Sequence, residues 1–298
     1  SWRWVFLINV PLAAATAALV AYAVPKSPPV DARAKVDVVG AVLCALGLGG
    51  PVFALIEEPR RGMGDPIILI TLFGGLAVFA AFVLWERRAA NAMLPLRLFA
   101  RRNFSFTNLE TLTVYAGLST LTFFLVLFLQ QQAGYTALKS GFALLPITIV
   151  MFALSPRVGR LSMRLGPRLF MGAGPLVGAV GLLGLIRLGT GFSYWLELLP
   201  PLVLFSIGLS MIVAPLTATV LAEVSEHDAG IASGVNNAVA RVASLLGIAV
   251  VGAAVAGSDN RLDLSGFRLS MAITAALVAV GGVIGFAGIR NPPPVDPA

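Results

Sequence analysis

The chain has 298 residues, of which 58% are hydrophobic and only 12% are charged, and its mean hydropathy is +0.90. In an ordinary soluble domain about a quarter of the residues are charged. The composition therefore excludes a soluble globular protein and predicts an all-α membrane protein. The net charge of +7 would be compatible with nucleic-acid binding, but nearly all the basic residues lie in short loops between apolar runs. That placement argues against a nucleic-acid partner and makes the lipid bilayer the expected one.

Nine apolar runs are long enough to cross a hydrocarbon core, which takes a helix of about 20 residues. In chain order, the runs are 5–24, 38–56, 66–85, 107–129, 141–158, 169–188, 196–219, 233–256 and 267–289. The first run also fits a secretory signal peptide, because Arg3 precedes it and residues 21–23 read AYA. Its length, and tryptophans at positions 2 and 4 that suit a membrane interface, favour a membrane span.

The distribution of Lys and Arg predicts the orientation. One alternating set of loops carries thirteen of the 21 basic residues, the other set carries seven, and Arg241 lies within a span. Basic loops face the cytoplasm, so we expect a multi-pass protein of the bacterial inner membrane with a cytoplasmic C-terminus. With nine spans and a cytoplasmic C-terminus, the N-terminus would lie outside. The simplest explanation for an external N-terminus is that the chain is a fragment that starts partway through its fold.

Several stretches resemble the fourteen-helix drug–proton antiporter branch of the major facilitator superfamily. Residues 2–11 read WRWVFLINVP, which is similar to the W-R-W-x-F-x-I-N-x-P that opens the sixth helix of that family. Residues 127–146 read LFLQQQAGYTALKSGFALLP and resemble L-x-L-Q-x-x-x-G-Y-S-x-x-x-x-G-x-x-x-L-P. Residues 214–222 and 229–237 read APLTATVLA and AGIASGVNN, which resemble segments near the penultimate helix of the family.

The resemblance implies a domain organisation. Residues 1–25 would be helix six, 26–90 two extra helices between the halves, 91–106 a cytoplasmic basic linker, 107–290 the C-terminal six-helix bundle, and 291–298 a disordered tail. Helices one to five would be missing and would be supplied by the rest of the same protein. In such transporters, substrate passes between two halves that rock around a site near the bilayer midplane.

A basic motif, GRLSMRLGPR, occupies residues 159–168 and resembles the cytoplasmic loop signature G-x-L-A-D-R-x-G-x-R of the superfamily. Glycines permit a tight turn, and arginines bond helix-end carbonyls and can lock one conformer. The departure is Met163, which stands where the family pattern has Asp, so the ion pair of that acid is lost. The motif predicts a gating loop, or alternatively a basic loop that only sets topology. Its gating candidates are Gly159, Arg160, Arg164, Gly166 and Arg168.

Arg241 is a charge within the eighth run, about one turn inside the predicted cytoplasmic boundary. An intramembrane charge rarely faces lipid and is a functional candidate. The family pattern N-x-x-R-Q places its arginine one residue earlier, which rotates the charge by about 100°. We expect Arg241 to face the central cavity with Asn237, and we include Asn236 as a candidate; the alternative is an arginine that snorkels to the interface.

Glu110, with Asn108 two residues before it, is the acid that lies closest to the interior of a span. A desolvated carboxyl group can carry a proton. The alternative is an interfacial acid that pairs with Arg101 or Arg102.

Other candidates lie at helix ends and bends. Gln130 and Gln131 end the fourth run and would contact substrate at the outer mouth, or form a hydrated helix end. The prolines at 146 and 215 match the family and are predicted bending points. Three G-x-x-x-G pairs predict close helix packing: Gly174 with Gly178, Gly230 with Gly234, and Gly281 with Gly285.

The sequence has one histidine, His227, and one cysteine, Cys44, so we expect neither a metal centre nor a disulfide, and no cofactor. With no phosphate loop and no catalytic triad in the sequence, an enzyme is not expected. The leading prediction is a secondary transporter that exports small amphiphilic compounds in exchange for protons, where the proton part comes from the resemblance. The alternatives are a metabolite or lipid transporter of the same fold, and a membrane remnant without transport of its own.

Overall fold

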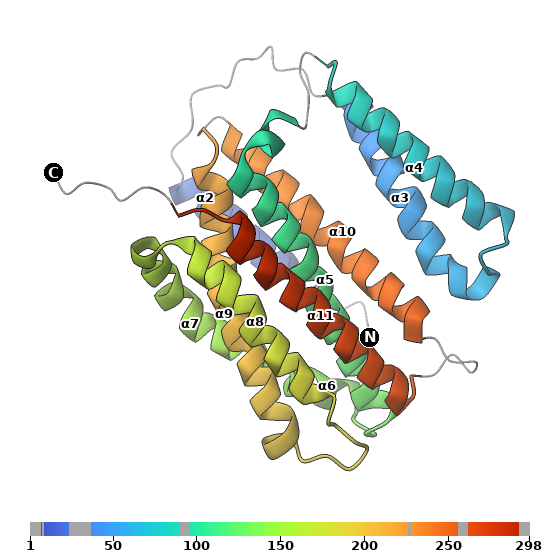
Figure 1. Cartoon of the computed structure of the whole chain (residues 1–298), viewed down its shortest axis with the longest axis vertical. Helices are drawn as coiled ribbons and strands as arrows, with labels where there is room; N and C mark the ends of the chain where they lie inside the picture. Colours follow the sequence, from blue (N-terminus) through green and yellow to red (C-terminus); the bar gives the residue numbers. More distant parts are fainter. Residues whose placement is uncertain are drawn as a thin grey trace. The chain divides into compact units, whose positions relative to one another are not determined.

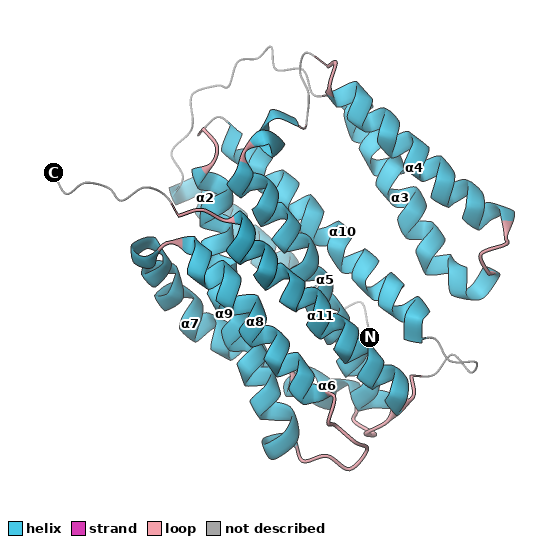
Figure 2. Ribbon diagram, in the orientation of Figure 1, coloured by secondary structure: helices cyan, strands magenta, loops and turns pink. Residues whose placement is uncertain are grey.

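The computed structural model describes residues 7, 9–23, 37–89, 94, 96–225, 228–255 and 262–291. Contacts divide the chain into two units, residues 1–37 and 38–298. The first unit contains α2 (Asn9–Ala23), an apolar helix of 15 residues. The second contains the other described helices, and Figure 2 shows that the described residues form helices and loops but no strand.

The second unit starts with a helical hairpin and continues as a bundle (Figure 1). The hairpin consists of α3 (Val38–Arg61) and α4 (Pro66–Glu86), which pack along each other. The later elements are η1 (Leu96–Ala100), α5 (Arg102–Gln131), α6 (Ala137–Ala143), α7 (Leu145–Leu165), α8 (Pro167–Leu185), η2 (Tyr194–Leu198), α9 (Leu199–Ala222), α10 (Ala229–Val255) and α11 (Leu264–Gly288).

Eight segments of the described residues are helical, long and apolar enough to cross a bilayer, and they coincide with eight of the nine predicted runs. The remaining run, 5–24, contains α2, whose described part is shorter. The predicted fold class, an all-α protein with about nine membrane helices, is therefore confirmed. The predicted tail from 292 onward and His227 lie outside the described residues.

Two boundaries differ from the sequence-based expectation. Helix α5 begins at Arg102, inside the segment predicted as linker, because the Arg102 guanidinium donates to the carbonyls of Gly288 and Ala287 and anchors the first turn. The run 141–158 is split at Leu144 into α6 and α7. Pro146 follows directly in the first turn of α7, where a residue without an N–H is tolerated.

Helix α5 lies inside the bundle, between α10 and α11. More than half of its most apolar stretch is buried (56%), as in α8 and α9, whereas only 17% is buried in α3, α4 and the α6–α7 segment. The apolar side chains that the second unit leaves uncovered on these helices suit contact with lipid or with other membrane helices.

Glycines set the closest helix contacts. A Cβ atom added to Gly174 of α8 would lie 2.8 Å from the carbonyl oxygen of Gly208 on α9, and one added to Gly281 of α11 would lie 2.6 Å from the Thr113 hydroxyl oxygen. Two predicted G-x-x-x-G pairs, at 174/178 and 281/285, thus lie at helix interfaces. The prediction is wrong for Gly230 and Gly234, where an added Cβ would meet nothing within 4 Å.

The start of α11 is capped by Asp263, whose carboxylate accepts from the Gly266 N–H at 2.6 Å and from the Ser265 hydroxyl at 2.6 Å. The Ser265 hydroxyl, followed by the Gly266 N–H, lowers the pKa of Asp263 below its ordinary value. The cap is therefore fully formed above the ordinary pKa of an aspartate and is lost only as the pH falls through the lowered value.

The Gly208→Ala variant should be less stable than the wild type by about 1–3 kcal/mol, because the added methyl group pushes α9 away from α8. The measurement is thermal unfolding in detergent, followed by tryptophan fluorescence. The control is Gly74→Ala on α4, where an added Cβ meets open space. Equal unfolding temperatures for the two variants would contradict this account of the α8–α9 contact.

Candidate functional site

A polar cluster joins α5 to α10 in the bundle. The Asn236 side-chain amide donates to the Thr111 hydroxyl oxygen at 2.8 Å and to the Asn108 amide oxygen at 3.3 Å. The Asn108 side chain in turn donates to the Phe104 carbonyl at 2.8 Å. Two predicted site residues, Asn108 and Asn236, therefore lie together. Thr111 was not among the predicted site residues, although it shares a helix face with Asn108 at a spacing of three.

Glu110 lies one position from this cluster along α5 and is fully buried, with 0% of its surface exposed. Neither carboxyl oxygen has a hydrogen-bond partner among the described residues. The arginines that the sequence offered as partners make other contacts, since Arg101 donates to the Glu223 carbonyl and Arg102 to carbonyls at the end of α11. Charging this carboxyl group would leave a buried charge without compensation, which is strongly unfavourable.

Arg241 is exposed on the second unit. Asn237 lies one helical turn earlier on α10 and is also exposed. Residues four apart share a helix face, so Asn237 and Arg241 form a polar stripe that the described part of the second unit leaves uncovered. Asn236, in contrast, points to α5, because one residue rotates the helix by about 100°.

The basic motif 159–168 forms the turn between α7 and α8. Gly166 has a φ of 85°, a conformation that favours glycine, and it ends α7. Arg168 then donates from its side chain to the Phe286 carbonyl at 2.9 Å and from its backbone to the Asn291 side chain at 3.1 Å. The turn is thereby attached to the end of α11. The other two motif arginines, Arg160 and Arg164, are exposed.

The glutamines at the end of α5 have different contacts. Gln131 accepts from the Leu262 N–H at 3.1 Å, and its neighbour Gln132 donates to the Leu262 carbonyl at 2.8 Å. These two hydrogen bonds hold the segment before α11 against α5. Gln130 and Gln131 are both exposed. Of the two predicted bending points, Pro215 lies inside α9 and Pro146 lies at the start of α7.

A second group of polar side chains, which was not predicted from the sequence, links η1 and the start of α5 to the α9–α10 connection. Arg97 of η1 pairs with Asp228 at 3.1 Å, and the Asn103 side chain donates to the Glu223 carboxylate at 2.8 Å. The partners are more than 100 residues apart in sequence, so no local spacing signals them. In the described ranges, no three His, Cys, Asp or Glu side chains gather in a way that could hold a metal ion.

Comparison with known proteins identifies relatives. Residues 1–248 match the model of the Major Facilitator Superfamily. A cephamycin export protein of Amycolatopsis lactamdurans is 34% identical over 270 residues, which cover 88% of this chain and 55% of that protein. A multidrug resistance protein of Mycobacterium tuberculosis is 31% identical over 86% of this chain and 47% of its own length.

A puromycin resistance protein of Streptomyces alboniger is 31% identical, over 86% of this chain and 51% of its own length. The chain thus spans about half the length of the curated relatives it matches. Their names are those of export and resistance proteins, which confirms the family resemblance drawn from the sequence motifs.

The Asn236→Ala variant should lose about 1 kcal/mol of stability, because it removes a hydrogen-bonded link between α5 and α10 and leaves the buried Asn108 amide oxygen without its donor. Thermal unfolding in detergent measures this loss. Asn237→Ala removes the neighbouring exposed amide and should unfold like the wild type. An equal loss in both variants would refute the assignment of Asn236 as the helix link.

Proposed function

This chain belongs to the Major Facilitator Superfamily, and we propose that it forms the C-terminal part of a secondary transporter that exports small amphiphilic compounds in exchange for protons. The names of the relatives that export cephamycin or confer resistance to puromycin support the export of small organic molecules. Further helices of the same protein would complete the pathway, and the protein would reside in the bacterial inner membrane with its basic turns and its C-terminus in the cytoplasm.

The observation that carries the proton part is the isolation of Glu110. A carboxyl group with no exposed surface and no hydrogen-bond partner is stable in the membrane interior only as the neutral acid. It releases its proton when water or a positive group reaches it. A rocking motion that opens and closes access to this part of α5 would therefore couple proton movement to transport.

The exposed stripe on α10 is the proposed substrate-facing surface. Arg241 and Asn237 offer a charge and an amide at membrane depth, where such groups normally face a cavity or another helix. Asn236, Asn108 and Thr111 hold α10 against α5 and so keep this stripe in position along the proposed transport path. The turn at 159–168, attached to α11 by Arg168, is the proposed cytoplasmic gate. We expect no enzymatic activity and no cofactor.

Glu110→Gln in the full transporter should abolish proton-driven export and flatten its dependence on pH, because glutamine keeps the shape of the neutral acid but cannot release a proton. The assay is the efflux of ethidium from proteoliposomes with an imposed pH gradient. Glu58→Gln, at the end of α3, is the matched control and should behave like the wild type. Unchanged pH dependence in Glu110→Gln would remove this residue from the proton path.

Arg241→Ala should lower the rate of ethidium export by at least about tenfold, because a hydrogen bond to a charged group contributes about 1.5–3 kcal/mol. Arg268→Ala removes an exposed arginine at the start of α11 and should leave the rate unchanged. If the Arg241→Ala variant exports ethidium at the same rate as Arg268→Ala, Arg241 has no role in transport and only extends its side chain to the membrane interface.

A further inference from the structure

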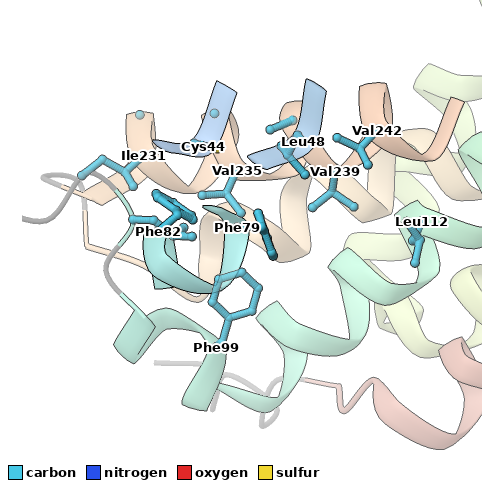
Figure 3. Close-up of a pocket in the computed structure, with 14 residues that line it drawn as sticks. Cys44, Leu48, Phe79, Phe82, Phe99, Leu112, Ile231, Val235, Val239 and Val242 are labelled. Atoms are coloured by element: carbon cyan, nitrogen blue, oxygen red, sulfur yellow. The ribbon is translucent and has the colours of Figure 1, made fainter. Parts of the chain in front are cut away.

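An apolar cavity of about 580 Å³ lies where the α3–α4 hairpin meets α5 and α10, within the second unit. We call it the hairpin cavity. Figure 3 shows the side chains of α4 and α10 that converge on it, with the aromatic rings at 79, 82 and 99 on one side and the valines of α10 on another. Its volume is typical of sites that bind small molecules. Its main lining residues are Cys44, Leu48, Phe79, Phe82, Val235 and Val239.

The lining lacks the groups by which a protein selects a polar molecule. Every lining side chain is a hydrocarbon except the thiol of Cys44. Sites for drugs and metabolites place a few convergent hydrogen-bonding groups among apolar ones. An amphiphilic substrate would find no partner here for its polar part, whereas a hydrocarbon chain needs none.

Two glycines of α10 keep the cavity open. Gly230 and Gly234 line it, and a Cβ added to either would meet nothing within 4 Å. The other two G-x-x-x-G pairs of the chain, by contrast, press against neighbouring helices or side chains. Next to Gly230 and Gly234, the hairpin and α10 therefore leave a space between them that no other described helix fills.

Two arginines follow α4 close to one end of the hairpin cavity. Arg87 and Arg88 directly follow α4, about 8 Å along the helix axis from Phe82, which lines the cavity. Both arginines are exposed.

The acidic side chains near this end already have partners. Glu86 accepts from the Leu94 N–H at 2.9 Å, and Asp228 pairs with Arg97 at 3.1 Å. Helix α4 is 21 residues long and spans the hydrocarbon core, so the arginines after it lie at the depth of lipid headgroups.

We propose that the hairpin cavity binds an acyl chain of an anionic phospholipid whose phosphate lies against Arg87 and Arg88. Apolar walls take the chain, and guanidinium groups at the membrane interface bind the phosphate, as in other basic pockets between membrane helices. The lipid would fill the space between the hairpin and the bundle. Asn237 and Arg241, the proposed substrate surface, are not among the lining residues of the cavity, although Ala238 and Val242 directly after them are.

The test uses the full transporter in phosphatidylcholine vesicles that contain phosphatidylglycerol with a photoreactive group in one acyl chain. After illumination, peptide mass spectrometry locates the attached lipid. We expect attachment to the cavity-lining parts of α3 and α10. The Gly234→Leu variant should lose this attachment, because leucine fills the cavity without a clash at Cβ. Gly74→Leu, a matched control on α4 with open space and outside the cavity lining, should keep it.

A second variant tests the headgroup. Arg87→Gln combined with Arg88→Gln should remove the preference for phosphatidylglycerol over an equally photoreactive phosphatidylcholine. Attachment in Gly234→Leu equal to that in Gly74→Leu would overturn the proposal, and so would displacement of the lipid by ethidium, which would make the cavity a substrate site. These outcomes do not depend on whether the protein exports ethidium, because lipid binding is read without transport.

Discussion

The absence of water in the bilayer core is the constraint on which this structure depends. Every backbone N–H and C=O group at that depth must find a partner inside the protein, so the membrane-crossing segments are helices. Lipid is as apolar as the side chains, and the helices are therefore held by close packing and by a few polar contacts. The glycines between α8 and α9 and the asparagine link between α5 and α10 are two such devices in this chain.

The same absence of water makes an unpaired polar side chain unfavourable, so the partners of the buried polar groups of α5 indicate their roles. Asn108 and Thr111 are satisfied by Asn236 and by their own helix, so they act as a structural joint. Glu110, one residue away from this joint, has no such contact in the described part of the chain. The hydrogen bonds of Asn236 hold α5 against α10, next to the carboxyl group of Glu110. This arrangement would allow Glu110 to gain and lose a proton while α5 stays packed against α10.

The hairpin of α3 and α4 contributes little to the buried core of the second unit. Its two helices pack mainly against each other, and α3 makes a smaller contact with α10. The hairpin cavity follows from this arrangement, since two glycines of α10 face the hairpin without touching it. Basic residues after α4 place positive charge at its end, and together these features make the hairpin a candidate site for lipid.

The sequence by itself determined the fold class and the positions of eight spans, because the length and hydrophobicity of a run decide whether it crosses a bilayer. It also pointed to Asn108, Asn236, Glu110 and Arg241, because polar groups within apolar runs are conspicuous. Only the tertiary structure decided what each residue faces. A helix turns by about 100° per residue, so Asn236 bonds to α5 whereas its neighbour Asn237 is exposed. No local sequence pattern distinguishes a packed G-x-x-x-G pair from the open one at Gly230 and Gly234. The ion pair of Arg97 with Asp228 joins distant parts of the chain, and it exists only because the bundle brings them together.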